Sequence, residues 1–194
     1  SLFKSEHGKN EILTLYDQKL SELKGNIDSI YLETSFGTTH ILKSGHPSLP
    51  PLILIHGSNG CAPIGLECYP NLIKKYQVFA VDVLAQPNRS AETRLSMKNN
   101  SYGQWVHELI SKLDLEEVTL AGFSFGGLII LKTLIHNNAK IKNAFLASPA
   151  YIVNGNPLNL IFKVFIPMRR YMMSKRVKYV EKFLSSVFTQ RDEF

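Results

Sequence analysis

The sequence predicts an α/β fold in which helices flank a mostly parallel sheet. Short apolar segments at residues 52–55, 78–83, 118–121 and 141–147 alternate with segments of helical periodicity. Strands that alternate with helices form parallel sheets through right-handed crossovers. The first segment is apolar at every position, which is typical of a strand buried on both faces. The chain has 194 residues, enough for one domain with a substantial core.

The amino-terminal part is expected to add one helix and two strands. Residues 10–23 place apolar side chains at helical spacing, so this helix should pack on the outside of the sheet. Residues 27–34 and 39–43 alternate around a Phe36–Gly37 turn, as in an antiparallel hairpin.

Two helices are expected between the later strands. Residues 65–76 should form the first, and the second should begin at Ser101, whose hydroxyl can form a capping box with Gln104. The buried face of the second helix consists of apolar residues at helical spacing, namely Trp105, Val106, Leu109, Ile110 and Leu113.

The part beyond residue 150 is expected to be helical and basic. Residues 157–165 keep helical spacing until Pro167 interrupts them, and residues 177–188 continue as a further helix. Of the 22 basic residues, six lie between positions 163 and 178 with no acidic residue among them, which leaves 16 basic against 16 acidic elsewhere. The net charge of +6 is therefore local to this segment, in Lys163, Arg169, Arg170, Lys175, Arg176 and Lys178.

Three interpretations of this charge remain open. A solvated helix face is favoured over an acidic partner or a membrane surface. Nucleic acid is the least favoured partner because no recognition motif accompanies the charge, and we expect none to bind.

The composition excludes several protein classes. No stretch approaches 18 apolar residues, and the chain does not begin with a charged and then apolar signal peptide, although it lacks an initiating methionine and a removed leader remains open. Cys61 and Cys68 form neither a disulfide framework nor a zinc pattern. We therefore expect reduced cysteines, a cytoplasmic location, and no metal or cofactor.

The chemistry is expected at Ser124. Residues 122–126, Gly-Phe-Ser-Phe-Gly, follow the apolar strand 118–121 and enter an apolar helix at 128–135. This Gly-x-Ser-x-Gly pattern is typical of a strained turn that exposes a nucleophilic serine, with glycines where strand and helix cross closely. The amide of Phe125 would face a developing oxyanion. The alternative is a serine in an ordinary strand-to-helix turn.

A second loop of small residues, His56 to Gly60, follows strand 52–55. Open α/β sheets bind ligands at the carboxyl ends of their strands, so this loop could supply a second oxyanion donor, or it could be a plain connection. We expect His56 to fix the loop and not to act as a base. The residues expected to line a substrate pocket are His56, Gly57, Asn59 and Phe123.

Four motifs in order, at 55–60, 82–90, 122–127 and 144–149, make the chain similar to an α/β-hydrolase of the carboxylesterase-like branch. The resemblance implies a serine hydrolase for carboxylic esters or related acyl bonds. Ser124 would be its nucleophile, and the amides of Ser58 and Phe125 would form its oxyanion hole. By the same resemblance, residues 1–150 would be the amino-terminal part of the core, and residues 151–194 the start of a helical cap.

One departure from this family concerns the triad, which runs serine, acid, histidine along the chain. The only histidine after Ser124 is His136, twelve residues along the same helix and therefore roughly 18 Å away. The only later aspartate is Asp192, at the chain end. We therefore expect the carboxyl-terminal part of the family, with its acid and histidine, to be missing, and the chain alone to be nearly inactive.

That departure has two further consequences. The chain could instead be a catalytically inactive module that binds a partner. A missing final strand would also leave an exposed sheet edge, which favours self-association.

Overall fold

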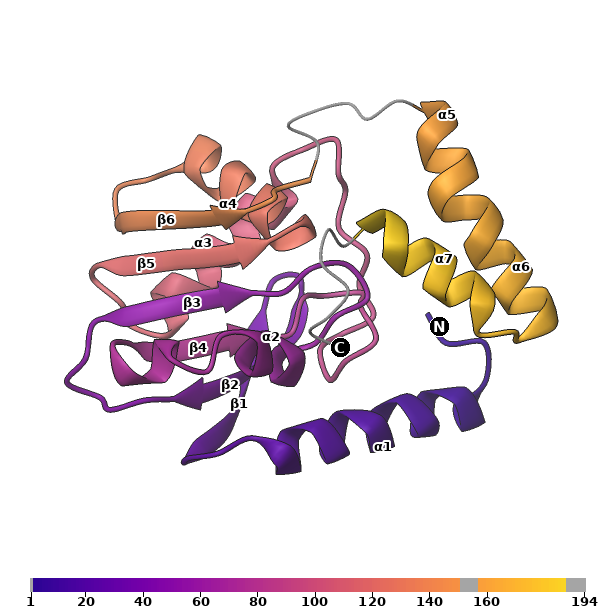
Figure 1. The fold of residues 1–194 in the computed structure, drawn as a ribbon. Coiled ribbons are helices and arrows are strands. Elements are labelled where there is room, and N and C mark those ends of the chain that lie inside the picture. Colours follow the sequence, from indigo (N-terminus) through magenta and orange to yellow (C-terminus); the bar gives the residue numbers. More distant parts are fainter. Residues whose placement is uncertain (1, 151–156, 188–194) are drawn as a thin grey trace. The chain divides into compact units, whose positions relative to one another are not determined.

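The computed structural model describes residues 2–150 and 157–187 (Figure 1). The chain divides into two compact units, residues 1–150 and residues 151–194. Each unit is described by itself.

The first unit contains a six-stranded sheet in the order β1-β2-β4-β3-β5-β6. β1 pairs antiparallel with β2, and β2 pairs antiparallel with β4, whereas β3, β4, β5 and β6 are parallel to one another. The predicted mostly parallel sheet is confirmed. Its strands are β1 (Ile27–Thr34), β2 (Gly37–Ser44), β3 (Pro51–Ile55), β4 (Gln77–Val81), β5 (Val118–Phe123) and β6 (Ile141–Ala147).

Helices cover both faces of this sheet (Figure 1). α3 (Ser101–Lys112) and α4 (Phe125–His136) pack on one core cluster, in which Trp105, Leu109 and Ile129 are fully buried. α1 (Glu6–Glu22) and α2 (Ala62–Cys68) contribute to a second cluster on the other face. The helical periodicity of 101–113 therefore predicted the buried face of α3 correctly.

Two local predictions in this unit are wrong. The helix expected at 65–76 begins at Ala62 and ends at Cys68, because Pro70 disfavours helical backbone at the preceding residue. Only a short 3₁₀ turn, Leu72–Lys74, follows. The capping box does not form either, because the hydroxyl of Ser101 donates to Oδ1 of Asn99 and the cap position falls on Asn100.

The described part of the second unit is mostly helical, with a short non-helical connection at residues 175–177. It contains α5 (Pro157–Leu160), a π-helical turn (Ile161–Phe165), α6 (Ile166–Ser174) and α7 (Lys178–Val187). The expected interruption at Pro167 is wrong: the proline lies in the first turn of α6, where a missing N–H costs little. Phe188 and Asp192 lie outside the described residues.

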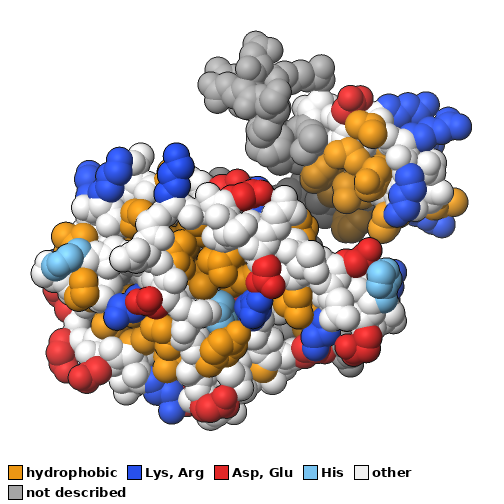
Figure 2. All heavy atoms as spheres, turned by 90° about the horizontal axis from the view of Figure 1, so that it is seen from below, with side chains coloured by type: hydrophobic (Ala, Val, Ile, Leu, Met, Phe, Trp, Pro, Cys, Tyr) orange, Lys and Arg blue, Asp and Glu red, His pale blue; other side chains and the backbone are white. Residues whose placement is uncertain are grey.

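This unit exposes both apolar and basic side chains. Figure 2 shows apolar side chains gathered on the visible face of the unit, with Lys and Arg around them. Phe162 is 62% exposed and Met173 is 77% exposed. Among the helices described in either unit, none is both long and apolar enough to cross a membrane.

Candidate active site

Ser124 occupies the sharp turn between β5 and α4. Its backbone has φ 52° and ψ −115°, a conformation that an L-residue with a side chain adopts only under strain. The amide of Ser124 donates to the carbonyl of Ala147 (3.0 Å), and its carbonyl accepts from the amide of Ala150 (2.9 Å). These bonds to the end of β6 hold the turn, while the residue itself remains exposed.

The glycines on either side of this turn are required by close packing. A Cβ at Gly126 would lie 2.1 Å from the carbonyl oxygen of Ile55, and one at Gly122 would lie 2.9 Å from the carbonyl carbon of Gly126. Both distances are far below a normal carbon contact. The predicted reason for glycine at these positions is confirmed.

The loop after β3 lies directly against this turn. A Cβ at Gly57 would lie 3.4 Å from the Cβ of Ser124 and 2.8 Å from the ring of Phe123. Ser58 and Asn59 follow as an exposed turn, and the amide of Asn59 donates to Oε1 of Gln86 (2.7 Å). The two loops that sequence singled out separately are thus brought together.

Phe125 presents its backbone and its side chain to different surroundings. It is the first residue of α4, so its amide has no acceptor within the helix and lies at the positive end of the helix dipole. Its ring is 8% exposed and packs edge-on against Tyr102, with ring centroids 5.4 Å apart. The packed ring anchors the start of α4.

His56 fixes the loop after β3, as predicted. The imidazole is 1% exposed, its Nδ1–H donates to the carbonyl of Gly57 (2.7 Å), and its Nε2 accepts from the amide of Val83 (3.0 Å). Burial lowers the pKa of His56, so the ring stays neutral. Of the residues expected to line a pocket, His56 and Gly57 are therefore buried, Phe123 is half-buried, and Asn59 is exposed.

No described histidine contacts the hydroxyl of Ser124. His136 lies at the opposite end of α4, with its ring 5.4 Å from that of His107. His46 bonds Ser48 in an exposed loop, and His40 is buried beside Asp82. His136 therefore lies too far along α4 to reach Ser124, as expected.

Sequence reasoning missed the role of Asp82 as an anchor. This fully buried carboxylate accepts from the amide of Ala62 (2.7 Å) and lies 2.8 Å from Nδ1 of His40. It thereby ties the first turn of α2 to β2 and to the loop after β4. Its position could have indicated this role, because Asp82 is an acidic residue immediately after the buried apolar strand β4.

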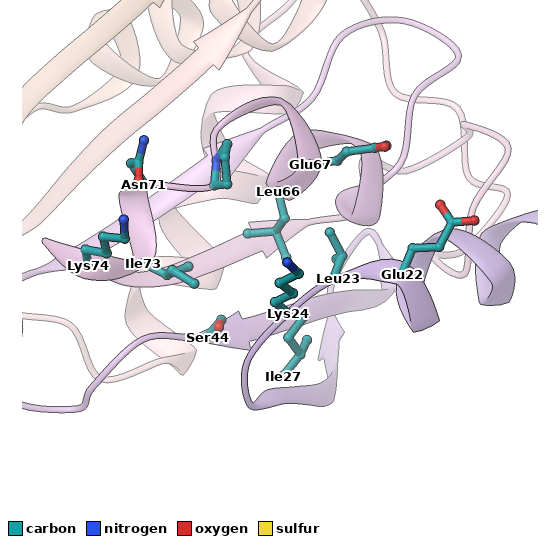
Figure 3. A pocket seen from close by; sticks show the side chains of 11 residues that line it. Glu22, Leu23, Lys24, Ile27, Ser44, Leu66, Glu67, Asn71, Ile73 and Lys74 are labelled. Atoms are coloured by element: carbon teal, nitrogen blue, oxygen red, sulfur yellow. The ribbon is translucent and has the colours of Figure 1, made fainter.

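A hollow of about 450 Å³ lies away from Ser124 (Figure 3). Leu23, Leu66 and Ile73 supply apolar side chains to it, and Lys24 and Lys74 stand at its rim. None of the residues assigned above to the loops around Ser124 lines it.

Comparison with known proteins decides the family. A family model described as the alpha/beta hydrolase fold matches residues 50–193. The chain belongs to the α/β-hydrolase family.

Relatives of this α/β-hydrolase include carboxylesterases. Carboxylesterase YbfK of Bacillus subtilis is 32% identical over 138 residues, which cover 70% of this chain and 46% of the relative. The uncharacterized carboxylesterase nap of the same organism is also 32% identical over 138 residues, covering 70% and 45%. The chain therefore spans about half the length of these relatives.

A solved structure supports the same assignment. The naproxen esterase (carboxylesterase NP) of Bacillus subtilis superposes with a TM-score of 0.77 at 26% identity, over 97% of this chain and 63% of that one. The α/β-hydrolase described here is thus carboxylesterase-like, as its motifs predicted.

Proposed function

We propose that the complete protein is a serine hydrolase that cleaves a carboxylic ester or a related acyl bond. The observation that carries this is the exposed, strained Ser124, held between Gly122 and Gly126 in a family member whose relatives are carboxylesterases. A structural neighbour is named naproxen esterase, which supports a small-molecule ester as the substrate class.

In this proposal the hydroxyl of Ser124 attacks the ester carbonyl. The amides of Phe125 and Ser58 hold the resulting tetrahedral oxyanion, because one begins α4 and the other follows Gly57, which packs against Ser124. Removing one donor from such a hole typically lowers the rate by about 10² to 10³. Residues 151–194 would form a helical cap over the substrate, and no cofactor is required.

The proton acceptor is proposed to lie outside the described residues. Ser124 has no imidazole contact among them, and the chain spans about half the length of its carboxylesterase relatives. Without the base and the acid, the oxyanion hole and substrate binding still accelerate the reaction by roughly 10³- to 10⁴-fold over the reaction in water. The 194-residue chain alone is therefore proposed to be nearly inactive. We also propose the cytoplasm as its location, because Cys61 and Cys68 are unpaired.

A binding module is the second candidate function. In the second unit, the exposed apolar side chains of Phe162, Met172 and Met173 lie in the same part of the chain as the six basic residues between 163 and 178. Such a surface fits an acidic or membrane partner. Its binding should weaken steeply with salt, and neutralising Arg169 and Arg170 should abolish it.

Hydrolysis of p-nitrophenyl esters tests these proposals. The 194-residue chain and its Ser124→Ala variant should both remain near the uncatalysed rate, whereas the protein isolated from its natural source should turn the ester over and lose this activity in the variant. Ordinary turnover by the 194-residue chain would contradict the placement of the base. Turnover by the native protein that survives Ser124→Ala would contradict the hydrolase proposal.

A further inference from the structure

A buried histidine, His40 on β2, lies between the hydroxyl of Ser29 on β1 and the carboxylate of Asp82, which follows β4. Its Nε2 lies 2.5 Å from Oγ of Ser29, and its Nδ1 lies 2.8 Å from Oδ2 of Asp82. Serine, imidazole and carboxylate connected in this order reproduce a Ser-His-Asp triad, which is recognised by geometry and not by position in the chain. Ser124, at the end of β5, takes no part in it.

The hairpin register explains why Ser29 and His40 meet. Ser29 pairs with Leu42 and Tyr31 pairs with His40, so Ser29 and His40 are diagonal neighbours on one face of the antiparallel pair. The ring of His40 is held between Tyr31, 4.7 Å away by ring centroids, and Tyr16 of α1, 6.0 Å away. The imidazole is fully buried, so its direction is set by these contacts.

The hydrogen bonds set the tautomer of His40. A carboxylate only accepts, so when Nδ1 of His40 donates to Asp82, Nε2 accepts from the hydroxyl of Ser29; the hydroxyl of Tyr16 also lies 3.2 Å from Nδ1. Burial, and next the charge of Asp82, raise the pKa of Tyr16, which remains a neutral hydroxyl bonded to the same carboxylate. The imidazole is therefore oriented as a base toward Ser29.

Ser29 is accessible to reagents in solution, although the imidazole of His40 is buried. Ser29 lies on the edge strand β1 and is exposed. Arg89 lies on the same side of the sheet: its Nη1 lies 3.5 Å from the hydroxyl of Tyr31, two residues along the strand from Ser29, and its Nη2 is paired with Asp17. Within the described part of the chain, the buried Nε of Arg89 has no hydrogen-bond partner.

We propose that Ser29 is a second nucleophile, activated by His40 and Asp82, that accepts acyl groups from esters with good leaving groups such as aryl esters. Oγ of Ser29 attacks the carbonyl carbon, and its proton passes to Nε2 of His40. The bond from this carbon to the aryl oxygen then breaks, and the departing phenolate takes the proton from His40. The acyl group stays on Ser29, so each chain releases one phenol at this site and does not turn the ester over.

The chain contains a matched control for this site. Oγ of Ser48 lies 2.7 Å from Nδ1 of His46, and both residues are exposed. No carboxylate contact to His46 occurs among the residues described. Ser48 therefore has an imidazole neighbour without the orienting acid that Asp82 provides.

The test is the rate at which a fluorophosphonate modifies each serine in the folded 194-residue chain carrying Ser124→Ala. The phosphorus–fluorine bond breaks, the serine oxygen bonds phosphorus, and fluoride leaves while the proton passes to the histidine. Peptide mapping should locate the adduct on Ser29 at least about 10²-fold faster than on Ser48, within the range that an oriented base contributes. Equal rates, or no adduct on Ser29, would overturn the proposal.

A His40→Gln variant checks the cause of the reactivity. If it folds, as circular dichroism would show, its adduct on Ser29 should form about 10²-fold more slowly, and an unchanged rate would contradict the role of His40. If it does not fold, the comparison of Ser29 with Ser48 decides alone. Because Ser124 is absent from this experiment, its outcome does not depend on the hydrolase proposed above.

Discussion

Gly57 and Ser124 come from the ends of neighbouring parallel strands, β3 and β5, and lie so close that a Cβ at Gly57 would be 3.4 Å from that of Ser124. The loop after β3 lies against the turn at Ser124 because β3 and β5 are adjacent and end at the same edge. In the proposed hydrolase, this contact would bring the amide of Ser58 toward the nucleophile.

Close packing at Gly126 predicts a large penalty for any side chain there. Gly126→Ala would bring a Cβ to 2.1 Å from the carbonyl oxygen of Ile55 and should lower the free energy of unfolding by about 3 kcal/mol or more. Gly8→Ala is the control, since its Cβ would meet Oγ of Ser5 at an ordinary 3.4 Å, and a helical alanine should raise stability by about 0.5–1 kcal/mol. Urea unfolding measures both, and equal effects would contradict this account.

Backbone strain at Ser124 predicts that glycine is the more stable replacement. Glycine tolerates the positive φ of this residue, so Ser124→Gly should have a free energy of unfolding about 1 kcal/mol higher than Ser124→Ala. At Ser111, within α3, alanine favours the helix, so Ser111→Ala should be more stable than Ser111→Gly by up to about 1 kcal/mol. Thermal or urea unfolding of the four variants gives the comparison. The same order at both positions would mean that the turn is unstrained.

The buried imidazole of His56 predicts a loss of stability in acid. Its folded-state pKa lies below the ordinary 6.5, so below that pH the unfolded chain binds a proton that the folded chain does not. Stability should fall as the pH drops from 6.5 toward the lower folded pKa, by at most about 1.4 kcal/mol per pH unit from this group.

Urea unfolding between pH 7.5 and 5.5 checks this slope. His56→Gln should remove the contribution of this buried imidazole and flatten the slope relative to the parent chain. A slope that is identical in His56→Gln and the parent chain would show that His56 is not the responsible group.

The edge of the sheet predicts self-association of the 194-residue chain. β6 pairs only with β5 within the described structure, and its Phe145 and Leu146 are 54% and 37% exposed. An unpaired apolar edge strand invites pairing with another chain. Sedimentation should show dimers or larger species, reduced by Phe145→Lys together with Leu146→Lys. A monomer at all concentrations would contradict the prediction.

Local patterns predicted the elements that depend on local physics. The strand at 52–55 could be predicted because burial on both faces requires an apolar residue at each position. The Gly-x-Ser-x-Gly turn could be predicted because only glycine fits where strand and helix cross closely. Two helix boundaries differ from the expected ones because the effect of proline depends on its place in a helix. Pro70 ends one helix, whereas Pro167 occupies the first turn of another.

The contacts of His40 could not be predicted in this way. Its meeting with Ser29 depends on the register of the hairpin, and its contact with Tyr16 depends on how α1 packs on the sheet. Both depend on strand register and helix packing, which the local sequence pattern does not fix. Similarly, sequence marked the loop after β3 and the turn at Ser124, but only strand order showed that Gly57 and Ser124 touch.

The most direct test of the central claim is to treat the protein isolated from its natural source with a fluorophosphonate, measure its intact mass, and locate the adduct by peptide mapping. This account predicts rapid modification of Ser124 in that protein and little modification of Ser124 in the 194-residue chain. A native protein that turns over esters while its Ser124 remains unmodified would contradict the assignment of Ser124 as the nucleophile.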